Sequence, residues 1–307
     1  WSCENKHAAL SERSGCDLSA DRTGFWSLDT SNCTTVINLT CKHPSRAATY
    51  HRLADCFVRE YLLITHVLEL VPAEEICITG LLNRGTFFTE LGISGFDTSR
   101  ILMEKREADS SCLAARYSSK DIVEIHPGVK KEVAVSQLQS NLKSLRSDPC
   151  DHIVLVKRAN TRSFSVEAFH ALFARLQERA RQRGTRLIVY HGNETVRKTI
   201  EVFSCASVVV AFHGAALGNL VFVQHGARAI EISTFLDTAS TKPWRNVVRG
   251  FKRRNRPDLN ATVVRIPVTH VVPDAEERAE KELDKLILNS RNIFLSAEEV
   301  ANIAQIV

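Results

Sequence analysis

A histidine followed by small residues is the first feature of the sequence that could do chemistry. The segment Ala211–Leu220 reads AFHGAALGNL and stands where an apolar run gives way to a helical pattern. In an open α/β sheet, ligands bind at the carboxyl ends of the strands. Gly214 and Ala215 would let a ligand approach the backbone, the amides of a helix start favour phosphate, and His213 would add a donor or a positive charge. We expect a diphosphate here; the alternative is a tight turn with a satisfied histidine.

Three cations and one carboxylate could complete the same site. Lys157, Arg158 and Arg162 follow the apolar run 153–156, so they would reach the same edge of a sheet. Arginine offers a fork of donors that suits a diphosphate. Glu231 stands inside another apolar run, where a carboxylate must be paired or must bind a ligand hydroxyl such as a ribose diol. Solvated loop charges and a structural salt bridge are the alternatives.

A second pair lies in the first half of the chain. His51 and Asp55 are four residues apart, which places them on one face of a helix. A histidine and a carboxylate on one face can hold and transfer a proton, as a general base requires; the alternative is an exposed helical pair. No Asp-x-Asp motif occurs in the sequence. The usual metal clamp on a diphosphate is therefore missing, and we expect no metal and no other cofactor.

Buried strands and helices alternate in the second half and would position these residues. Between and after the runs lie helical patterns at 166–180, 196–203 and 215–222, the first begun by Ser165 and ended at Gly184. This β-α-β-α-β-α-β order predicts a doubly wound parallel sheet. The apolar, β-branched runs are 153–156, 187–190, 208–211 and 229–232.

The first half is less regular and suits a second α/β domain. Turn-forming residues at 147–151 mark a plausible boundary, and a capping box joins Ser296 to Glu299 in the last of two closing helices, the other following Pro273. We therefore expect three parts, residues 1–150, 151–272 and 273–307. In the first of them we expect a helix over 47–70, strands at 76–79 and 122–125, and a helix over 133–145.

Composition restricts the class of protein. The 307 residues carry a net charge of +5, too small an excess to indicate nucleic acid. The basic run at 252–256 is interpreted as a solvated loop. The longest apolar stretches are far shorter than the roughly 20 residues that span a bilayer. The chain starts at Trp1, so a signal peptide or anchor could have been removed.

Cysteines and glycosylation sequons suggest an oxidising compartment. Nine cysteines occur, and none forms a Cys-x-x-Cys pair with zinc spacing. Disulfides persist in the secretory pathway and not in the cytosol, so we expect that location. The odd count leaves one thiol over, and Cys205 is the candidate, on the buried face of a helix. The N-glycosylation sequons stand at Asn32, Asn38, Asn193 and Asn260.

Taken together, these segments resemble the signature of glycosyltransferase family 61. Residues 208–232, VVVAFHGAALGNLVFVQHGARAIEI, are similar to its strand, its His-Gly-Ala-Gly-Leu-Thr-Asn turn and its Val-Ile-Glu strand. Residues 154–158 with Arg162 resemble the family's strand-plus-arginine segment. Residues 50–55, YHRLAD, look like its His-x-x-x-Asp element. Members include an EGF-domain O-GlcNAc transferase, an O-mannose GlcNAc transferase and plant xylosyl and arabinosyltransferases.

The resemblance implies an α/β GT-B fold, in which two Rossmann-like domains face a cleft. It also implies a nucleotide-sugar donor, a UDP-linked GlcNAc or pentose, together with a glycoprotein or polysaccharide acceptor, inversion at the anomeric carbon and no metal. The Golgi or endoplasmic reticulum lumen would be the location, with an N-terminal membrane anchor that this chain lacks. The residues implied at the donor are Lys157, Arg158, Arg162, His213, Gly214, Ala215, Asn219 and Glu231, and those at the acceptor are His51 and Asp55.

Departures from the family pattern put the donor's identity, rather than donor binding, in question. Ala216 stands where the family often has Gly, Gly218 where it has Thr or Ser, and Thr199 where Gln is frequent. The chain is also short for two full domains. Two other functions stay open: a transferase of the polysaccharide pyruvyltransferase type, and a catalytically silent, secreted glycan-binding protein of the same fold.

Overall fold

The structure is a computed structural model, and the chain divides into two compact units, residues 1–46 with 55–134 and residues 47–54 with 135–307. The residues that it describes are 34–38, 61, 63–64, 67, 70–72, 75–79, 101–102, 121–124, 138–140, 142, 146, 150–158, 162–234, 247–272 and 292–307.

The first unit contains a four-stranded sheet in the order β3-β2-β1-β4, with every neighbouring pair parallel. This 3-2-1-4 order matches the first four positions of the 3-2-1-4-5-6 order found in dinucleotide-binding sheets. The strands expected at 76–79 and 122–125 are confirmed as β2 and β4, the latter starting one residue earlier. The strand bounds are β1 (Thr35–Asn38), β2 (Ile76–Thr79), β3 (Ile101–Leu102) and β4 (Asp121–Glu124).

The second unit contains a five-stranded parallel sheet in the order β6-β5-β7-β8-β9. Along this unit the order is 2-1-3-4-5, one of the two common doubly wound arrangements, in which ligands bind where the winding reverses, between strands 1 and 3. The reversal falls between β5 and β7. The bounds are β5 (His152–Val156), β6 (Arg186–Tyr190), β7 (Ala206–Phe212), β8 (Arg228–Thr234) and β9 (Asn260–Ile266).

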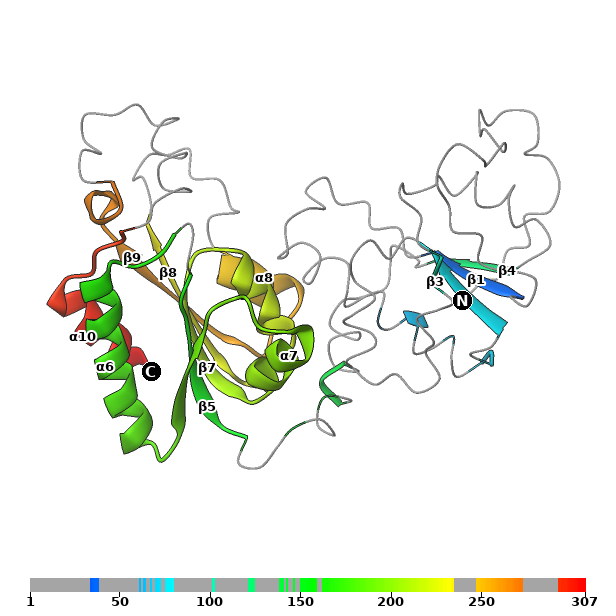
Figure 1. The fold of residues 1–307 in the computed structure, drawn as a ribbon, viewed down its shortest axis with the longest axis horizontal. Helices are drawn as coiled ribbons and strands as arrows, with labels where there is room; N and C mark the ends of the chain where they lie inside the picture. Colours follow the sequence, from blue (N-terminus) through cyan, green and yellow to red (C-terminus); the bar gives the residue numbers. More distant parts are fainter. Residues whose placement is uncertain are drawn as a thin grey trace. The chain divides into compact units, whose positions relative to one another are not determined.

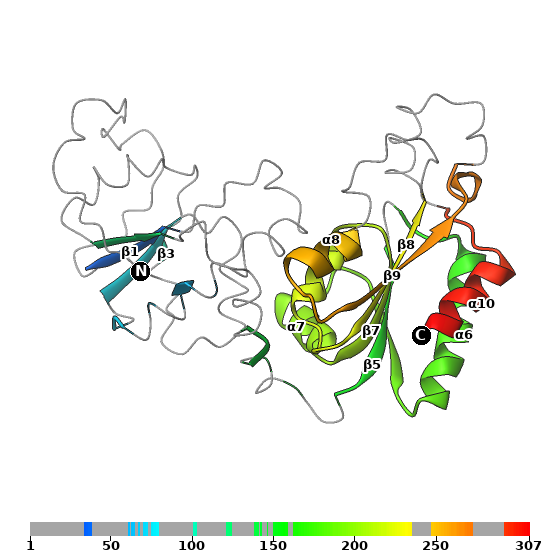
Figure 2. The same cartoon turned by 180° about the vertical axis from the view of Figure 1, so that it is seen from behind.

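Helices cover both faces of this sheet. Figures 1 and 2 show α6 (Val166–Gln182) and α10 (Ala297–Ile306) on one face, with α7 (Val196–Ser204) and α8 (Val247–Arg254) on the other. Alternate residues of β5, β7, β8 and β9 pack with α6 and α10 in one apolar core. Covering on both faces explains why four of the strands are continuous apolar runs, and these four expected strands are confirmed.

Local signals in the sequence set the helix ends. Ser165 Oγ accepts a hydrogen bond from the amide of Ala168 at the start of α6, and Gly184, with φ at 66°, follows its end. The expected capping box at α10 is confirmed, since Ser296 and Glu299 bond each other's backbone amides. The helix expected after Pro273 lies outside the described residues.

Cys205 is not an unpaired thiol. It forms a disulfide with Cys150, 55 residues earlier in sequence, with the two Cα atoms 4.6 Å apart. Cys205 is buried as expected, but it caps the end of α7, beside the start of β5, rather than lying on a helix face. The amide of His152 donates to its carbonyl. The pairing follows from the parallel alignment of β5 and β7, which the sequence alone did not give.

Two further expectations need correction. The turn after β7 is a seven-residue 3-10 helix, η6 (Ala215–Val221), rather than an α-helix. The basic run at 252–256 is not a solvated loop: it starts in the last turns of α8, and the side chain of Arg256 is 1% exposed. Within the described ranges, no helix is long and apolar enough to cross a membrane, and no three His, Cys, Asp or Glu side chains gather as metal ligands.

Candidate functional site

The site lies at the carboxyl ends of β5 and β7, where the winding of the sheet reverses. β7 ends at Phe212, and the amide of His213 donates to the carbonyl of Ile232 in β8, which extends the pairing by one residue. β5 ends at Val156, so Lys157 and Arg158 leave the sheet at the same edge. The expectation that the histidine turn and the cations share one edge is thus met by the strand order itself.

His213 contacts Glu231 across the neighbouring strand. Its Nδ1 atom is 2.6 Å from Glu231 Oε1; the histidine side chain is 15% exposed and the carboxylate fully buried. Ala211 and Glu231 are register partners, so their side chains lie on the same face of the sheet. His213 is two residues after Ala211, so it also faces that side, which α8 covers. A carboxylate in that position accepts a hydrogen bond from Nδ1–H and thereby fixes the orientation of the ring.

Glu231 also receives the first helical amides of α8. The Val248 amide donates to Oε2 at 2.9 Å, and the Val247 amide lies 3.4 Å from Oε1. A helix start carries free donors and partial positive charge, and these stabilise a buried carboxylate. In this structure Glu231 therefore joins the histidine turn to α8, which agrees with the alternative of a structural pair; ribose binding by Glu231 stays a prediction.

Arg158 and Arg162 converge on Gly214. A Cβ atom at position 214 would overlap Arg158 Nη1 and lie 3.4 Å from Arg162 Nη1. The absence of a side chain on Gly214 is therefore what admits both guanidinium groups to the backbone of the turn. The positive charges of Arg158 and Arg162 repel each other. An anion between or beside them would relieve this repulsion.

Arg162 carries three signs of a strained, charged position. Its φ is 57°, in the left-handed region that side chains rarely adopt. Its Nε atom is buried and has no hydrogen-bond partner among the described residues. Burial, and then the charge of Arg158, lower the pKa of Arg162 to about 10, and burial alone lowers the pKa of Arg158. Strain and unmet donors of this kind gather at ligand sites, where the surrounding fold maintains them.

The remaining residues expected at the donor are distributed differently. Lys157 lies over the ring of Phe169 on α6, with Nζ 4.4 Å from the ring centroid, so it leaves the sheet away from Gly214. Asn219 is 4% exposed and lies beneath the turn, where its amide is 3.5 Å from the hydroxyl of Tyr190. Ala215 begins η6 and is half-buried. Asn219 thus shapes the turn from inside.

A buried hydroxyl pair supports Asn219. The hydroxyl of Tyr190, at the end of β6, is 3.2 Å from Thr199 Oγ1 on α7, and burial raises the pKa of Tyr190. Thr199 stands where the resembled family often has Gln, and here it serves this internal network. Thr199 therefore contributes to the packing beneath the site through its contact with Tyr190.

Several expected residues lie elsewhere or outside the description. His51, Asp55 and Asn32 are outside the described residues. Asn38 ends β1 in the first unit. Asn193 and Asn260 are exposed, in the turn before α7 and at the first residue of β9 respectively. Exposure is what an N-linked glycan requires.

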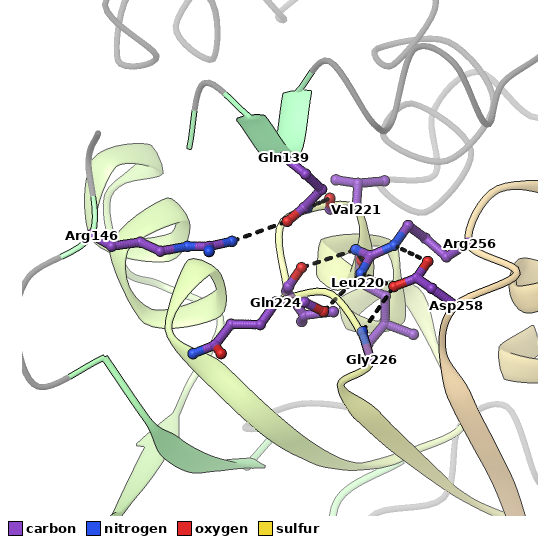
Figure 3. Close-up of polar contacts among 9 residues, drawn as sticks. Gln139, Arg146, Leu220, Val221, Gln224, Gly226, Arg256 and Asp258 are labelled. Atoms are coloured by element: carbon purple, nitrogen blue, oxygen red, sulfur yellow. Dashed lines mark hydrogen bonds and ion pairs between the residues drawn. The ribbon is translucent and has the colours of Figure 1, made fainter. Parts of the chain in front are cut away.

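The sequence interpretation missed Arg256 and Asp258, which hold the loop behind the turn. Figure 3 shows the Arg256 guanidinium between Asp258 and the carbonyls of the loop that follows η6. In the sequence Arg256 looks like one more residue of a basic run. The available signal was Asp258 two residues later, a spacing that allows a local ion pair.

Comparison with known proteins bears on what this site does. The sequence profile described as Glycosyltransferase 61 matches residues 39–230, well over half of the chain. No curated protein matches the chain. Among solved structures, it is similar to the glycosyl transferase family 9 structure from Veillonella parvula DSM 2008, with 12% identity and a TM-score of 0.38, covering 89% of this chain and 96% of that chain. It is less similar to the flavodiiron protein from Giardia intestinalis, with 10% identity and a TM-score of 0.26, covering 63% and 48%.

Proposed function

The chain belongs to the glycosyltransferase 61 family, and from this premise we propose that it moves a sugar from a nucleoside diphosphate to a hydroxyl group with inversion. Membership makes it a glycosyltransferase, which requires a sugar donor and an acceptor. The finer statement concerns the donor, a UDP-linked GlcNAc or pentose, and the acceptor, a glycoprotein or polysaccharide. A GT-B arrangement of the two units belongs to the same proposal.

The convergence of Arg158 and Arg162 on Gly214 is the observation that carries the donor assignment. Both guanidinium groups lie in a partly buried place at the switch point, against the backbone of Gly214. A diphosphate would neutralise the two charges and give Arg162 Nε an acceptor. His213, oriented by Glu231 at 2.6 Å, stands at the end of the adjacent strand to meet the same group.

The reaction proposed is a single displacement. Asp55, or His51 oriented by it, takes the proton of the acceptor hydroxyl, and the oxygen attacks the anomeric carbon from the face opposite the diphosphate. The bond between that carbon and the diphosphate oxygen breaks, and its electron pair leaves with the nucleoside diphosphate. Arg158 and Arg162 stabilise the charge that develops on this leaving group, a task that a metal performs in other transferases.

The secretory pathway is the compartment that the chemistry favours. The buried Cys150–Cys205 disulfide and the exposed Asn193 and Asn260 sequons suit an oxidising, glycosylating lumen. We therefore propose the Golgi or endoplasmic reticulum lumen as the location of the protein.

A panel of nucleotide sugars tests the proposal. The protein is incubated with each in the presence of EDTA, and release of nucleoside diphosphate and the shift in melting temperature are measured. We expect one donor to raise the melting temperature and to release its diphosphate when an acceptor is added. The Arg158→Ala and His213→Ala variants should lose turnover by about 100-fold or more. Stabilisation without release for every donor and acceptor would favour the silent glycan-binding protein.

A further inference from the structure

The end of the 3-10 helix that carries the site is held by side chains from elsewhere in the chain. A helix leaves its last carbonyls without internal partners, and η6 is no exception. The side-chain amide of Gln139 donates to the Val221 carbonyl at 2.8 Å, and Arg146 in turn donates to Gln139 Oε1 at 3.0 Å. Arg256 donates to the carbonyls of Leu220 and Val223, before and after Val221 in the sequence (Figure 3).

Every donor of Arg256 is engaged. Nη1 donates to the carbonyls of Leu220 and Val223 at 3.1 and 2.9 Å, and Nη2 donates to that of Gln224 at 2.8 Å. Nε and Nη2 form a bidentate pair with Asp258, at 2.8 and 2.7 Å. A guanidinium group has five N–H donors, and these five contacts account for all of them. Arg256 is also only 1% exposed, so it has nothing left with which to touch a substrate.

The loop that Arg256 grips joins the two halves of the candidate site. Residues 220–226 run from the end of η6, which follows His213 and Gly214, to β8, which carries Glu231. Asp258 fixes the far end of this loop by accepting from the Gly226 amide at 3.1 Å. The Gln224 side chain donates to the carbonyls of Cys150 and Cys205, which ties the loop to the disulfide.

The first residues of the site turn have little that would fix their position, although Leu217, Asn219 and Leu220 bury its inner side. Gly214, Ala215, Ala216 and Gly218 present almost no side chain for packing, and 3-10 hydrogen bonds have poorer geometry than those of an α-helix. Besides its buried inner side, such a turn depends on contacts at its two ends. The paired β7 strand holds one end, and the Arg256 cluster holds the other.

We propose that Arg256 is a positioning residue for the donor-binding turn. It acts through the carbonyls of Leu220, Val223 and Gln224, and Asp258 in turn orients its guanidinium group. This inference rests on the proposed function, since the turn matters to catalysis only if it receives the donor. A merely structural arginine would contribute to stability alone, whereas a positioning residue also sets the affinity for the diphosphate.

The test compares Arg256→Lys with a matched control, Arg179→Lys. Arg179 also grips helix-end carbonyls, donating to Ala304 at 2.9 Å and to Gln305 at 3.4 Å, but it lies on α6, against α10 and on the other face of the sheet. Lysine keeps the charge and loses the fork in both variants. Both should lower the melting temperature. Only Arg256→Lys should weaken binding of UDP, by about tenfold in calorimetry below the melting temperature, and raise the KM for the donor but not that for the acceptor.

Hydrogen exchange separates this inference from the proposed function. In the protein without ligand, amides of residues 213–219 should exchange faster in Arg256→Lys than in wild type, and should be unchanged in Arg179→Lys. If wild type binds none of UDP, GDP and ADP, the donor assignment fails, and exchange still decides whether Arg256 fixes the turn. If Arg256→Lys does not fold, Asp258→Asn takes its place. This milder variant keeps the three hydrogen bonds from Arg256 to carbonyls and removes only the charge that orients its guanidinium group. Unchanged exchange at 213–219 together with wild-type UDP affinity would overturn the inference.

Discussion

The guanidinium group of Arg158 occupies the space that a Cβ atom on Gly214 would take. The two residues follow the ends of different strands, β5 and β7, and meet because these strands are neighbours at the switch point of the sheet. The close approach brings a fixed positive charge against the backbone of the turn. The glycine is therefore a requirement of the arginine's position, and this relation can be tested.

Replacing Gly214 by alanine should displace Arg158 and reduce donor turnover, by about tenfold or more. The reason is steric, since the methyl group overlaps Nη1 and the guanidinium must shift. A double-mutant cycle measures this dependence: in an Arg158→Ala background, Gly214→Ala should cost little further activity, because the overlapping atom is gone. Equal losses in both backgrounds would show that Gly214 acts independently of Arg158.

Arg162→Asn should lower activity without lowering stability. Asn tolerates the left-handed backbone at φ 57°, and the change removes a buried donor without a partner in the described structure and a charge facing Arg158. We expect the free energy of unfolding to stay level or to rise by about 1 kcal/mol, while donor turnover falls by about 100-fold. Urea unfolding and initial rates measure the two effects.

Arg181→Asn serves as the control for Arg162. Arg181 is 68% exposed on α6 and pairs with Glu178 at 2.7 Å, so its loss should change neither activity nor stability by much. A large loss of stability in Arg162→Asn with full activity would identify Arg162 as a structural residue.

The contact between His213 and Glu231 should appear as a coupling energy in the protein without ligand. The pair is 2.6 Å apart with a fully buried carboxylate, so removing either partner removes the hydrogen bond between them. We expect His213→Ala and Glu231→Gln to be coupled by about 1–3 kcal/mol in urea unfolding. A ribose-binding glutamate with no role in the free protein would give no coupling.

The strands that position the site could be predicted from the sequence, whereas most of the side-chain contacts within it could not. Strands of the second unit were readable because a sheet covered on both faces makes each of them a continuous apolar run. β9 was not predicted because only two of its seven residues are buried, and Arg265 is exposed within it. That Arg158 and Gly214 share one edge followed from parallel strands, whereas their direct contact depends on which two strands are neighbours.

The residues missed were those whose partners lie far away in sequence. Arg256 reaches carbonyls 32 to 36 residues earlier in the chain, and Cys205 pairs across 55 residues. Lys157 follows the right strand but lies over Phe169, because neighbouring residues at a strand end face opposite sides of the sheet. Type and local spacing carry no information on such contacts.

Removing the Cys150–Cys205 disulfide should destabilise the second unit by about 2–4 kcal/mol, since the bond constrains a loop of some 55 residues in the unfolded chain. Unfolding of the Cys150→Ser, Cys205→Ala double variant is compared with that of wild type, with and without a reductant. The two proteins should differ in the oxidised state and converge when reduced. A difference that persists under full reduction would mean that packing, rather than the bond, is responsible.

Acid should weaken the Arg256–Asp258 pair in a defined range of pH. Burial acts to raise the pKa of Asp258, but the hydrogen bonds and charge of Arg256 outweigh it and lower the pKa from 3.8 to about 2. A carboxyl group whose pKa is lower in the folded state stabilises the fold fully above its unfolded value, and this contribution disappears as the pH falls toward the folded value. The urea midpoint of wild type should therefore exceed that of Asp258→Asn by a constant amount at pH 5–7, and the gap should narrow between pH 4 and 2. If the difference between the two urea midpoints stays constant from pH 4 to pH 2, the carboxylate of Asp258 does not hold Arg256 in place.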